Sequence, residues 1–285
     1  MKPILFEWGW FHISSYGVLL ALAFVAAMVI GNREFRNNNA NLSIAWDIYL
    51  LAILGGLIGS RLLFILENWP EFLARPTEIL FSTAGFSVLG GFLLSFILCA
   101  VRVRRAGEPF LRMADLCSPS MAIGYAIGRL GCITAGDGCY GLPTKSWFGM
   151  TFPHGIVSTL SARNIMLKEK FLSLFPHMPV PVDIPVHPTP LYESISGWLL
   201  VGVLLLPGWK IGPGKRFAAF LAWFGISRFL VEFIRLNPIW HFGLTSDQVL
   251  AIGMILCSIF LFLSQSKNIP QESSEHREMN RESGC

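Results

Sequence analysis

The chain has 285 residues, of which 53% are hydrophobic and only 14% are charged. Soluble domains carry about 25% charged residues, so this deficit, with a mean hydropathy of +0.55, excludes a disordered protein and a water-soluble globule. Lys and Arg number 22 against 18 Asp and Glu, a net charge of +4. This excess is too small and too dispersed to predict a nucleic-acid partner. The composition therefore predicts an integral membrane protein in contact with membrane lipid.

Seven apolar segments are candidates for membrane helices, because a helix needs about 20 apolar residues to cross a bilayer. We therefore expect an all-α integral membrane protein with about seven transmembrane helices. In chain order, the segments cover residues 15–30, 45–66, 85–101, 114–133, 190–206, 217–236 and 249–263.

The Lys and Arg residues outside these segments are divided unevenly between the two sides. Twelve follow the first, third, fifth and seventh segments, whereas six lie on the other side, four of them in the long loop 134–189. Cytoplasmic loops carry the excess of Lys and Arg, and long loops count for little in this rule. We therefore expect the N-terminus outside and the C-terminus in the cytoplasm.

The segments between and after the apolar stretches indicate how the chain is organised. We expect one seven-span transmembrane domain over residues 1–265. The loop 134–189 is rich in Phe and Pro, and we interpret it as an external cap on the membrane surface that is not an independent domain. Residues 266–285 are polar and charged without periodicity, which is typical of disorder, so we expect a disordered cytoplasmic tail.

Six cysteines are scattered along the chain, with no CxxC spacing. Zinc sites recognisable from sequence use closely spaced Cys and His ligands, so the sequence predicts no metal site, and no cofactor is expected. Free buried thiols are the simplest interpretation. A disulfide between Cys132 and Cys139 is the alternative if both face an oxidising compartment.

Four arginines remain in or beside the apolar segments, namely Arg61, Arg129, Arg228 and Arg235. An arginine near the bilayer centre costs about 3 kcal/mol or more, so each needs a function or a partner. Residues 228, 232 and 235 are spaced i, i+4, i+7, which predicts one helical face. With Glu232 between two guanidiniums, this face keeps a positive surplus that suits an anion such as phosphate.

Arg129 lies among glycines that recur every three or four residues and is followed by a Gly-rich turn that contains Asp137. The glycines permit close helix packing, but the amides of such a turn, beside an arginine, also form an anion-binding nest. Glu193, just inside the fifth segment, is expected to pair with an arginine. Arg61 is expected either to snorkel or pair with a carboxylate, or to belong to a functional site.

Six short motifs, in order from residue 16 to residue 248, resemble those of bacterial prolipoprotein diacylglyceryl transferases. The matching stretches are Tyr16-Gly17, Gly-Ser-Arg-Leu at 59–62 near Asn68-Trp69, Gly-Arg-Leu-Gly at 128–131, His-Pro-Thr-Pro-Leu-Tyr-Glu at 187–193, Arg-Phe-Leu-Val-Glu-Phe-Ile-Arg at 228–235 and Leu-Thr-Ser-Asp-Gln at 244–248.

The resemblance implies a seven-span enzyme of the bacterial inner membrane with its N-terminus outside. Such an enzyme moves the diacylglyceryl group of phosphatidylglycerol onto the lipobox cysteine thiol of a preprolipoprotein signal peptide, giving a thioether and glycerol phosphate. The resemblance also implies that two arginines, Arg129 and Arg228, hold the phosphate and that Glu232 orients arginines. Asp137 stands at a position that belongs to the family's active site. The implied catalytic residues are Arg129, Arg228, Glu232 and Asp137, and the implied substrate-binding residues are Tyr16, Arg61, Gly90, Arg235 and Glu193.

The chain departs from the family pattern at three places. Leu89 stands where the family has a His that is a candidate base, Cys132 stands where it has Asn, and Asp137 replaces a Glu beside an apparent one-residue insertion. These differences are compatible with an active transferase that uses Asp137 or His12 as its base. They are also compatible with a non-catalytic paralogue that binds anionic phospholipid or signal peptides. An anion transporter is a third hypothesis. Transport needs a continuous polar pathway across the membrane, whereas the polar residues cluster near the outer half of the predicted spans.

Overall fold

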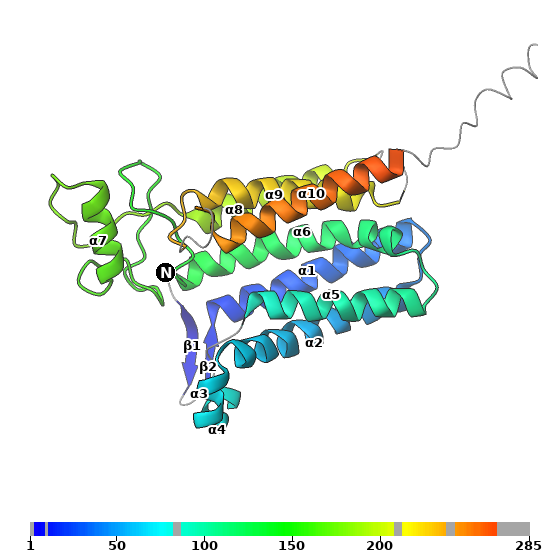
Figure 1. The fold of residues 1–285 in the computed structure, drawn as a ribbon, viewed down its shortest axis with the longest axis horizontal. Coiled ribbons are helices and arrows are strands. Elements are labelled where there is room, and N and C mark those ends of the chain that lie inside the picture. Colours follow the sequence, from blue (N-terminus) through cyan, green and yellow to red (C-terminus); the bar gives the residue numbers. More distant parts are fainter. Residues whose placement is uncertain (1–2, 9–10, 82–86, 208–212, 238–242, 267–285) are drawn as a thin grey trace, which may run out of the picture.

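The computed structural model describes residues 3–8, 11–81, 87–207, 213–237 and 243–266. The structure is mostly helical, which confirms the expected class, and its described strands form one hairpin, β1 (Ile4–Trp8) with β2 (Phe11–Ser14). This hairpin was not predicted. It precedes the first apolar segment and lies at one end of the helices (Figure 1).

The long helices run side by side along the longest axis of the molecule (Figure 1). Each overlaps one of the seven predicted segments. In chain order they are α1 (Ser15–Asn37), α2 (Leu42–Glu67), α5 (Val88–Arg105), α6 (Phe110–Ala135), α8 (Thr189–Leu205), α9 (Lys215–Glu232) and α10 (Ser246–Ser266).

Three stretches are long and apolar enough to cross a membrane, namely Ser15–Asn37, Leu42–Glu67 and Ser246–Ser264, and Thr189–Leu205 is a shorter apolar helix. Large apolar side chains on several helices point away from the protein interior. Val29 on α1 is 63% exposed and Phe260 on α10 is 69% exposed. Surfaces of this kind fit a lipid environment better than water, as the composition predicts.

Local hydrogen bonds explain where the long helices begin. The Ser14 hydroxyl accepts the amide of Gly17 at 3.0 Å and caps α1. Asp115 of α6 accepts the amides of Gly214 and Phe217 at 2.5 and 2.7 Å, and it therefore caps α9 from a neighbouring helix. Such caps satisfy amides that have no partner within the helix.

Close packing between α2 and α5 depends on two facing glycines. A Cβ atom added to Gly59 would overlap the carbonyl of Gly90 and lie 2.6 Å from Cβ of Leu94, and a Cβ atom added to Gly90 would overlap the carbonyl of Gly59. Gly90 therefore allows α5 to pack closely on α2, and its place at the substrate stays a prediction.

Gly59→Ala is expected to destabilise the protein by about 1–3 kcal/mol, because the added methyl group forces α2 and α5 apart. The matched control is Gly202→Ala in α8, where an added Cβ meets no described atom within 4 Å. The midpoint of thermal unfolding in detergent measures both variants. Equal midpoints for the two variants would contradict the packing role of Gly59.

The remaining elements gather at the end of the helices that also carries the β1–β2 hairpin (Figure 1). Helices α3 (Trp69–Ala74) and α4 (Pro76–Phe81) follow α2, and α7 (Ile165–Leu174) lies in the segment between α6 and α8. That segment, which we call the cap, has a core of its own. The core consists of Tyr140, Phe152, Leu167, Phe171, Ile184 and Val186. The predicted disordered tail falls outside the described residues except for its first residue, Ser266.

Candidate active site

Four helices bring charged side chains together at the capped end of the bundle. Helix α8 packs closely on α6, since the Ser194 hydroxyl donates to the Ala126 carbonyl at 2.9 Å and Gly197 lies directly against Ala126. Helix α9 contacts α8 through a hydrogen bond of 2.9 Å between the hydroxyls of Ser196 and Ser227. These contacts fix the distances between α6, α8 and α9, and therefore between the charged residues that the three helices carry nearby.

Glu193 of α8 is the centre of the charged cluster and is fully buried. Its Oε1 accepts hydrogen bonds from Arg228 Nη1 at 2.5 Å and from the Tyr125 hydroxyl at 2.9 Å. Its Oε2 lies 3.3 Å from Arg129 Nε and 3.7 Å from Arg235 Nη1. The expected pairing of Glu193 with an arginine is therefore confirmed, and one carboxylate joins three guanidiniums.

Arg228 has two further acidic neighbours. Its Nη2 lies 2.5 Å from Oδ2 of Asp247 and 3.7 Å from Oε2 of Glu232. Asn237 connects the two acids, because its amide donates to Glu232 at 2.6 Å and to Asp247 at 3.2 Å. The side chain of Glu232 is fully buried, whereas that of Asp247 is 35% exposed. Asp247 is therefore the partner of Arg228 that solvent or a ligand reaches most easily.

The cluster holds three arginines and three carboxylates, so the positive surplus expected from the 228–235 segment alone is wrong for the assembled site. The two additional acids, Glu193 and Asp247, come from α8 and α10. The side chains of Arg129 and Arg228 are only 19% and 13% exposed. Removing a charge from water at this depth costs several kcal/mol unless it is paired, and the carboxylates provide that pairing.

Arg235 does not lie on the same helix as Arg228, contrary to the predicted spacing. Helix α9 ends at Glu232, and Arg235 forms an isolated antiparallel bridge with Gly141 of the cap. Next to it, the amide of Leu142 donates to the carbonyl of Ile234 at 2.8 Å. Strand-like pairing with the cap therefore ends the helix early, but Arg235 Nε still lies 3.9 Å from Oε2 of Glu232.

The other predicted site residues divide into two groups. Tyr16 of α1 lies against Gly131 of α6, where an added Cβ would be 3.1 Å from the Tyr16 ring. Arg61 lies elsewhere and donates to the backbone carbonyls of Ile79 and Leu80 in α4. Arg61 therefore holds α4 in this structure, as Gly90 holds α2 against α5.

Three residues of the cluster were not assigned by sequence reasoning. Tyr125 and Asn237 carry no charge, and nothing in their sequence context separates them from ordinary polar residues of a helix end. Asp247 lies in the Leu-Thr-Ser-Asp-Gln motif at 244–248, so its motif was found but its role was not. A carboxylate at the start of an apolar segment was the signal that identified Glu193, and the same signal applies to Asp247.

The departures from the family pattern lie in different surroundings. Leu89 is 48% exposed at the start of α5, whereas Cys132 is buried with its Sγ 3.9 Å from Arg129 Nη1. In the turn after α6, a hydrogen bond from the Cys132 thiol lowers the pKa of Cys139. His12 is exposed on β2.

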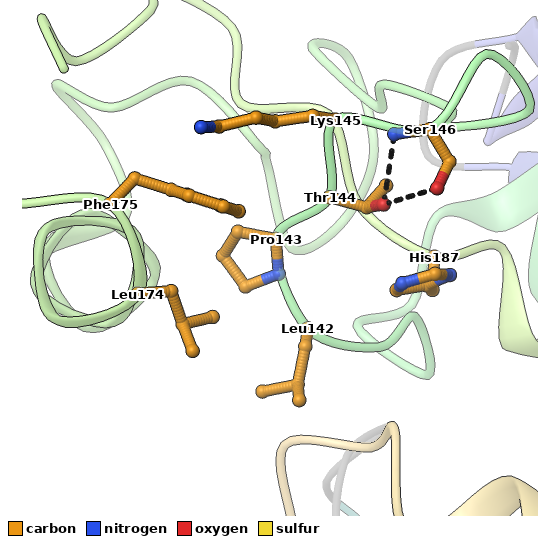
Figure 2. Close-up of a pocket in the computed structure, with 8 residues that line it drawn as sticks. All are labelled: Leu142, Pro143, Thr144, Lys145, Ser146, Leu174, Phe175 and His187. Atoms are coloured by element: carbon orange, nitrogen blue, oxygen red, sulfur yellow. Dashed lines mark hydrogen bonds between the residues drawn. The ribbon is translucent and has the colours of Figure 1, made fainter.

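A cavity of about 480 Å³ lies in the cap, and no residue of the charged cluster lines it (Figure 2). At one side of the cavity, the Lys145 ammonium lies over the Phe175 ring, 4.2 Å from its centre. At the opposite side lies His187, and burial lowers the pKa of its imidazole. His187 belongs to the 187–193 motif that leads to Glu193. The lining residues are Leu142, Pro143, Thr144, Lys145, Ser146, Leu174, Phe175 and His187.

The fold and the site together define a helical membrane protein with a buried arginine–carboxylate cluster beneath a cap. The family model described as prolipoprotein diacylglyceryl transferase matches residues 3–264, and the chain belongs to this family.

Several relatives carry the name phosphatidylglycerol–prolipoprotein diacylglyceryl transferase. The protein of that name from Clostridium tetani (strain Massachusetts / E88) is 28% identical over 264 residues, which cover 92% of this chain and 97% of the relative. A Leptospira interrogans relative (serovar copenhageni, strain Fiocruz L1-130) is 29% identical over 313 aligned positions, covering 91% of each chain.

Proposed function

We propose that this protein transfers the diacylglyceryl group of phosphatidylglycerol to the lipobox cysteine of preprolipoproteins. Family membership and the names of the relatives support the reaction class and both substrates. The observation that carries the proposal is the convergence of Arg129 and Arg228 on one buried carboxylate, Glu193. Paired guanidiniums at a protein–lipid boundary match the geometry of a phosphate.

In this reaction the acceptor sulfur forms a bond to the glyceryl carbon, and the carbon–oxygen bond to phosphate breaks. The electron pair of that bond leaves with the glycerol phosphate, so negative charge develops on the phosphate oxygen. Prearranged donors stabilise such charge best in a site that excludes water. Arg129 and Arg228 are these donors, and the fixed carboxylates of Glu193 and Glu232 hold their orientation.

The phosphate competes with an acid that already pairs with Arg228. Asp247 is the partially exposed partner at 35%, whereas Glu193 and Glu232 are fully buried. A lipid phosphate therefore displaces Asp247 at a lower cost than either buried acid. In this proposal Tyr16 of α1 contacts the head group, and Asp137, in the turn after α6, belongs to the catalytic site.

All seven long helices cross the membrane in this proposal, with the N-terminus outside and the C-terminus in the cytoplasm of a bacterial cell with an inner membrane. The ends of α6 and α9 and the starts of α8 and α10 lie at the capped end (Figure 1). That end then faces outward, where secreted precursors arrive. Residues 1–265 form one transmembrane unit in this proposal, with the 134–189 cap outside.

The test uses the purified chain in vesicles of phosphatidylglycerol with a synthetic lipobox peptide. We expect the cysteine peptide to gain the mass of one diacylglyceryl group, whereas the matched peptide with serine in place of cysteine stays unmodified. Mass spectrometry reads the modification. Peptide and lipid binding without any mass gain would contradict the enzyme and favour the non-catalytic binding paralogue.

A further inference from the structure

Three potential metal ligands converge beside Arg129. The sulfurs of Cys132 and Cys139 and a carboxylate oxygen of Asp137 all lie within 4.8 Å of one another. Cys132 is in the last turn of α6, and the other two follow in the turn after Gly136. The two cysteines do not form a CxxC pair, which is why the sequence predicted no metal site.

The turn that brings the three ligands together is fixed by its surroundings. Gly136 has a φ of +60°, and an added Cβ there would lie 2.6 Å from Cα of Gly155 in the cap. Oδ1 of Asp137 accepts the amide of Cys139 at 3.1 Å, which orients the carboxylate and leaves its second oxygen available. The Thr189 hydroxyl donates to the Cys139 carbonyl at 2.5 Å.

The charges of the cluster suit a divalent ion. Two thiolates and one carboxylate carry three negative charges, so a divalent ion neutralises two of them, and the guanidinium of Arg129 lies 3.9 Å from the Cys132 sulfur. Sulfur ligands select zinc over magnesium or calcium. Three protein ligands with an open fourth position are typical of catalytic zinc sites, whereas structural sites have four.

We propose that Cys132, Asp137 and Cys139 bind a zinc ion whose open position takes the acceptor cysteine thiol. This inference rests on the proposed transferase function. A thiol bound to zinc loses its proton, which passes to solvent, and the sulfur keeps the electron pair that forms the new bond to the glyceryl carbon. The site then supplies the thiolate in a chain where Leu89 replaces the family's candidate base.

Cobalt chloride is the probe, because cobalt(II) occupies zinc sites and its thiolate complexes absorb light. The full chain, purified in detergent and treated with a chelator, is expected to bind stoichiometric cobalt with sulfur-to-metal charge-transfer absorption. Cys132→Ser and Cys139→Ser are expected to lose most of this absorption, and the near-isosteric Asp137→Asn is expected to bind cobalt more weakly. Cys257→Ser, an exposed cysteine of α10, is the matched control and is expected to retain it.

Metal binding and transfer are measured separately on the same samples. Cobalt binding that is present in the wild type and weakened or lost in the three ligand variants supports the metal site. If the same wild-type protein lipidates no peptide, the transferase function is contradicted and the metal site is not. Unchanged transfer in chelated protein that binds no cobalt would overturn the site and leave the function intact. A Cys132–Cys139 disulfide in the native protein, seen as two thiols protected from alkylation, would also overturn it.

Discussion

Arg228→Ala is expected to reduce diacylglyceryl transfer by about 100-fold or more. Removing one prearranged donor from a transition-state anion costs other enzymes about 10²–10³ in rate. Arg228 occupies such a place, since it contacts Glu193 and Asp247 at 2.5 Å each and its side chain is 13% exposed. The initial rate of peptide lipidation in phosphatidylglycerol vesicles measures the loss.

The matched control for Arg228 is Arg102→Ala. Arg102 also pairs with an aspartate, Asp47, at 2.6 Å, but near the opposite end of the helices and with 33% of its side chain exposed. We expect this variant to retain the wild-type rate. Equal rate losses in the two variants would mean that Arg228 contributes only to folding.

Glu193→Ala is expected to lower the free energy of unfolding by about 3–5 kcal/mol, the usual cost of removing one partner from a buried ion pair. The variant leaves Arg129, Arg228 and Arg235 close together with one fewer carboxylate between them. Glu193→Gln should cost less, because the amide oxygen still accepts the Tyr125 hydroxyl. The midpoint of thermal unfolding in detergent follows both variants.

Glu78→Ala is the control for Glu193. Glu78 pairs with Arg75 at 3.4 Å, but both side chains are about 70% exposed, and exposed pairs contribute little to stability. We expect no measurable change in its unfolding midpoint. A Glu193→Ala protein as stable as Glu78→Ala would show that the carboxylate does not neutralise the arginines.

The sequence was sufficient to predict the seven long helices, because a long apolar run favours a helix almost independently of its neighbours, whereas the short helices α3, α4 and α7 were not predicted. All seven predicted segments coincide with long helices. Pairings between helices were harder to predict. Glu193 joins arginines from α6, α9 and the segment after α9, and no local pattern encodes which helices meet.

Two features that sequence reasoning did not predict depend on contact with the cap. The early end of α9 depends on the bridge between Arg235 and Gly141. The meeting of Cys132, Asp137 and Cys139 depends on a turn held by Gly155. Such contacts join residues far apart in sequence, so periodicity and spacing carry no signal for them.

In the proposed mechanism the arginines stabilise the leaving phosphate and do not merely bind lipid. The most direct test is the single-turnover transfer rate of wild type and Arg228→Ala at saturating phosphatidylglycerol, with lipid affinity measured in parallel. An interaction made mainly in the transition state lowers the rate at saturation. We predict a loss of about 100-fold at saturation with a much smaller change in affinity. A loss of lipid affinity with an unchanged rate at saturation would contradict this role of the arginines.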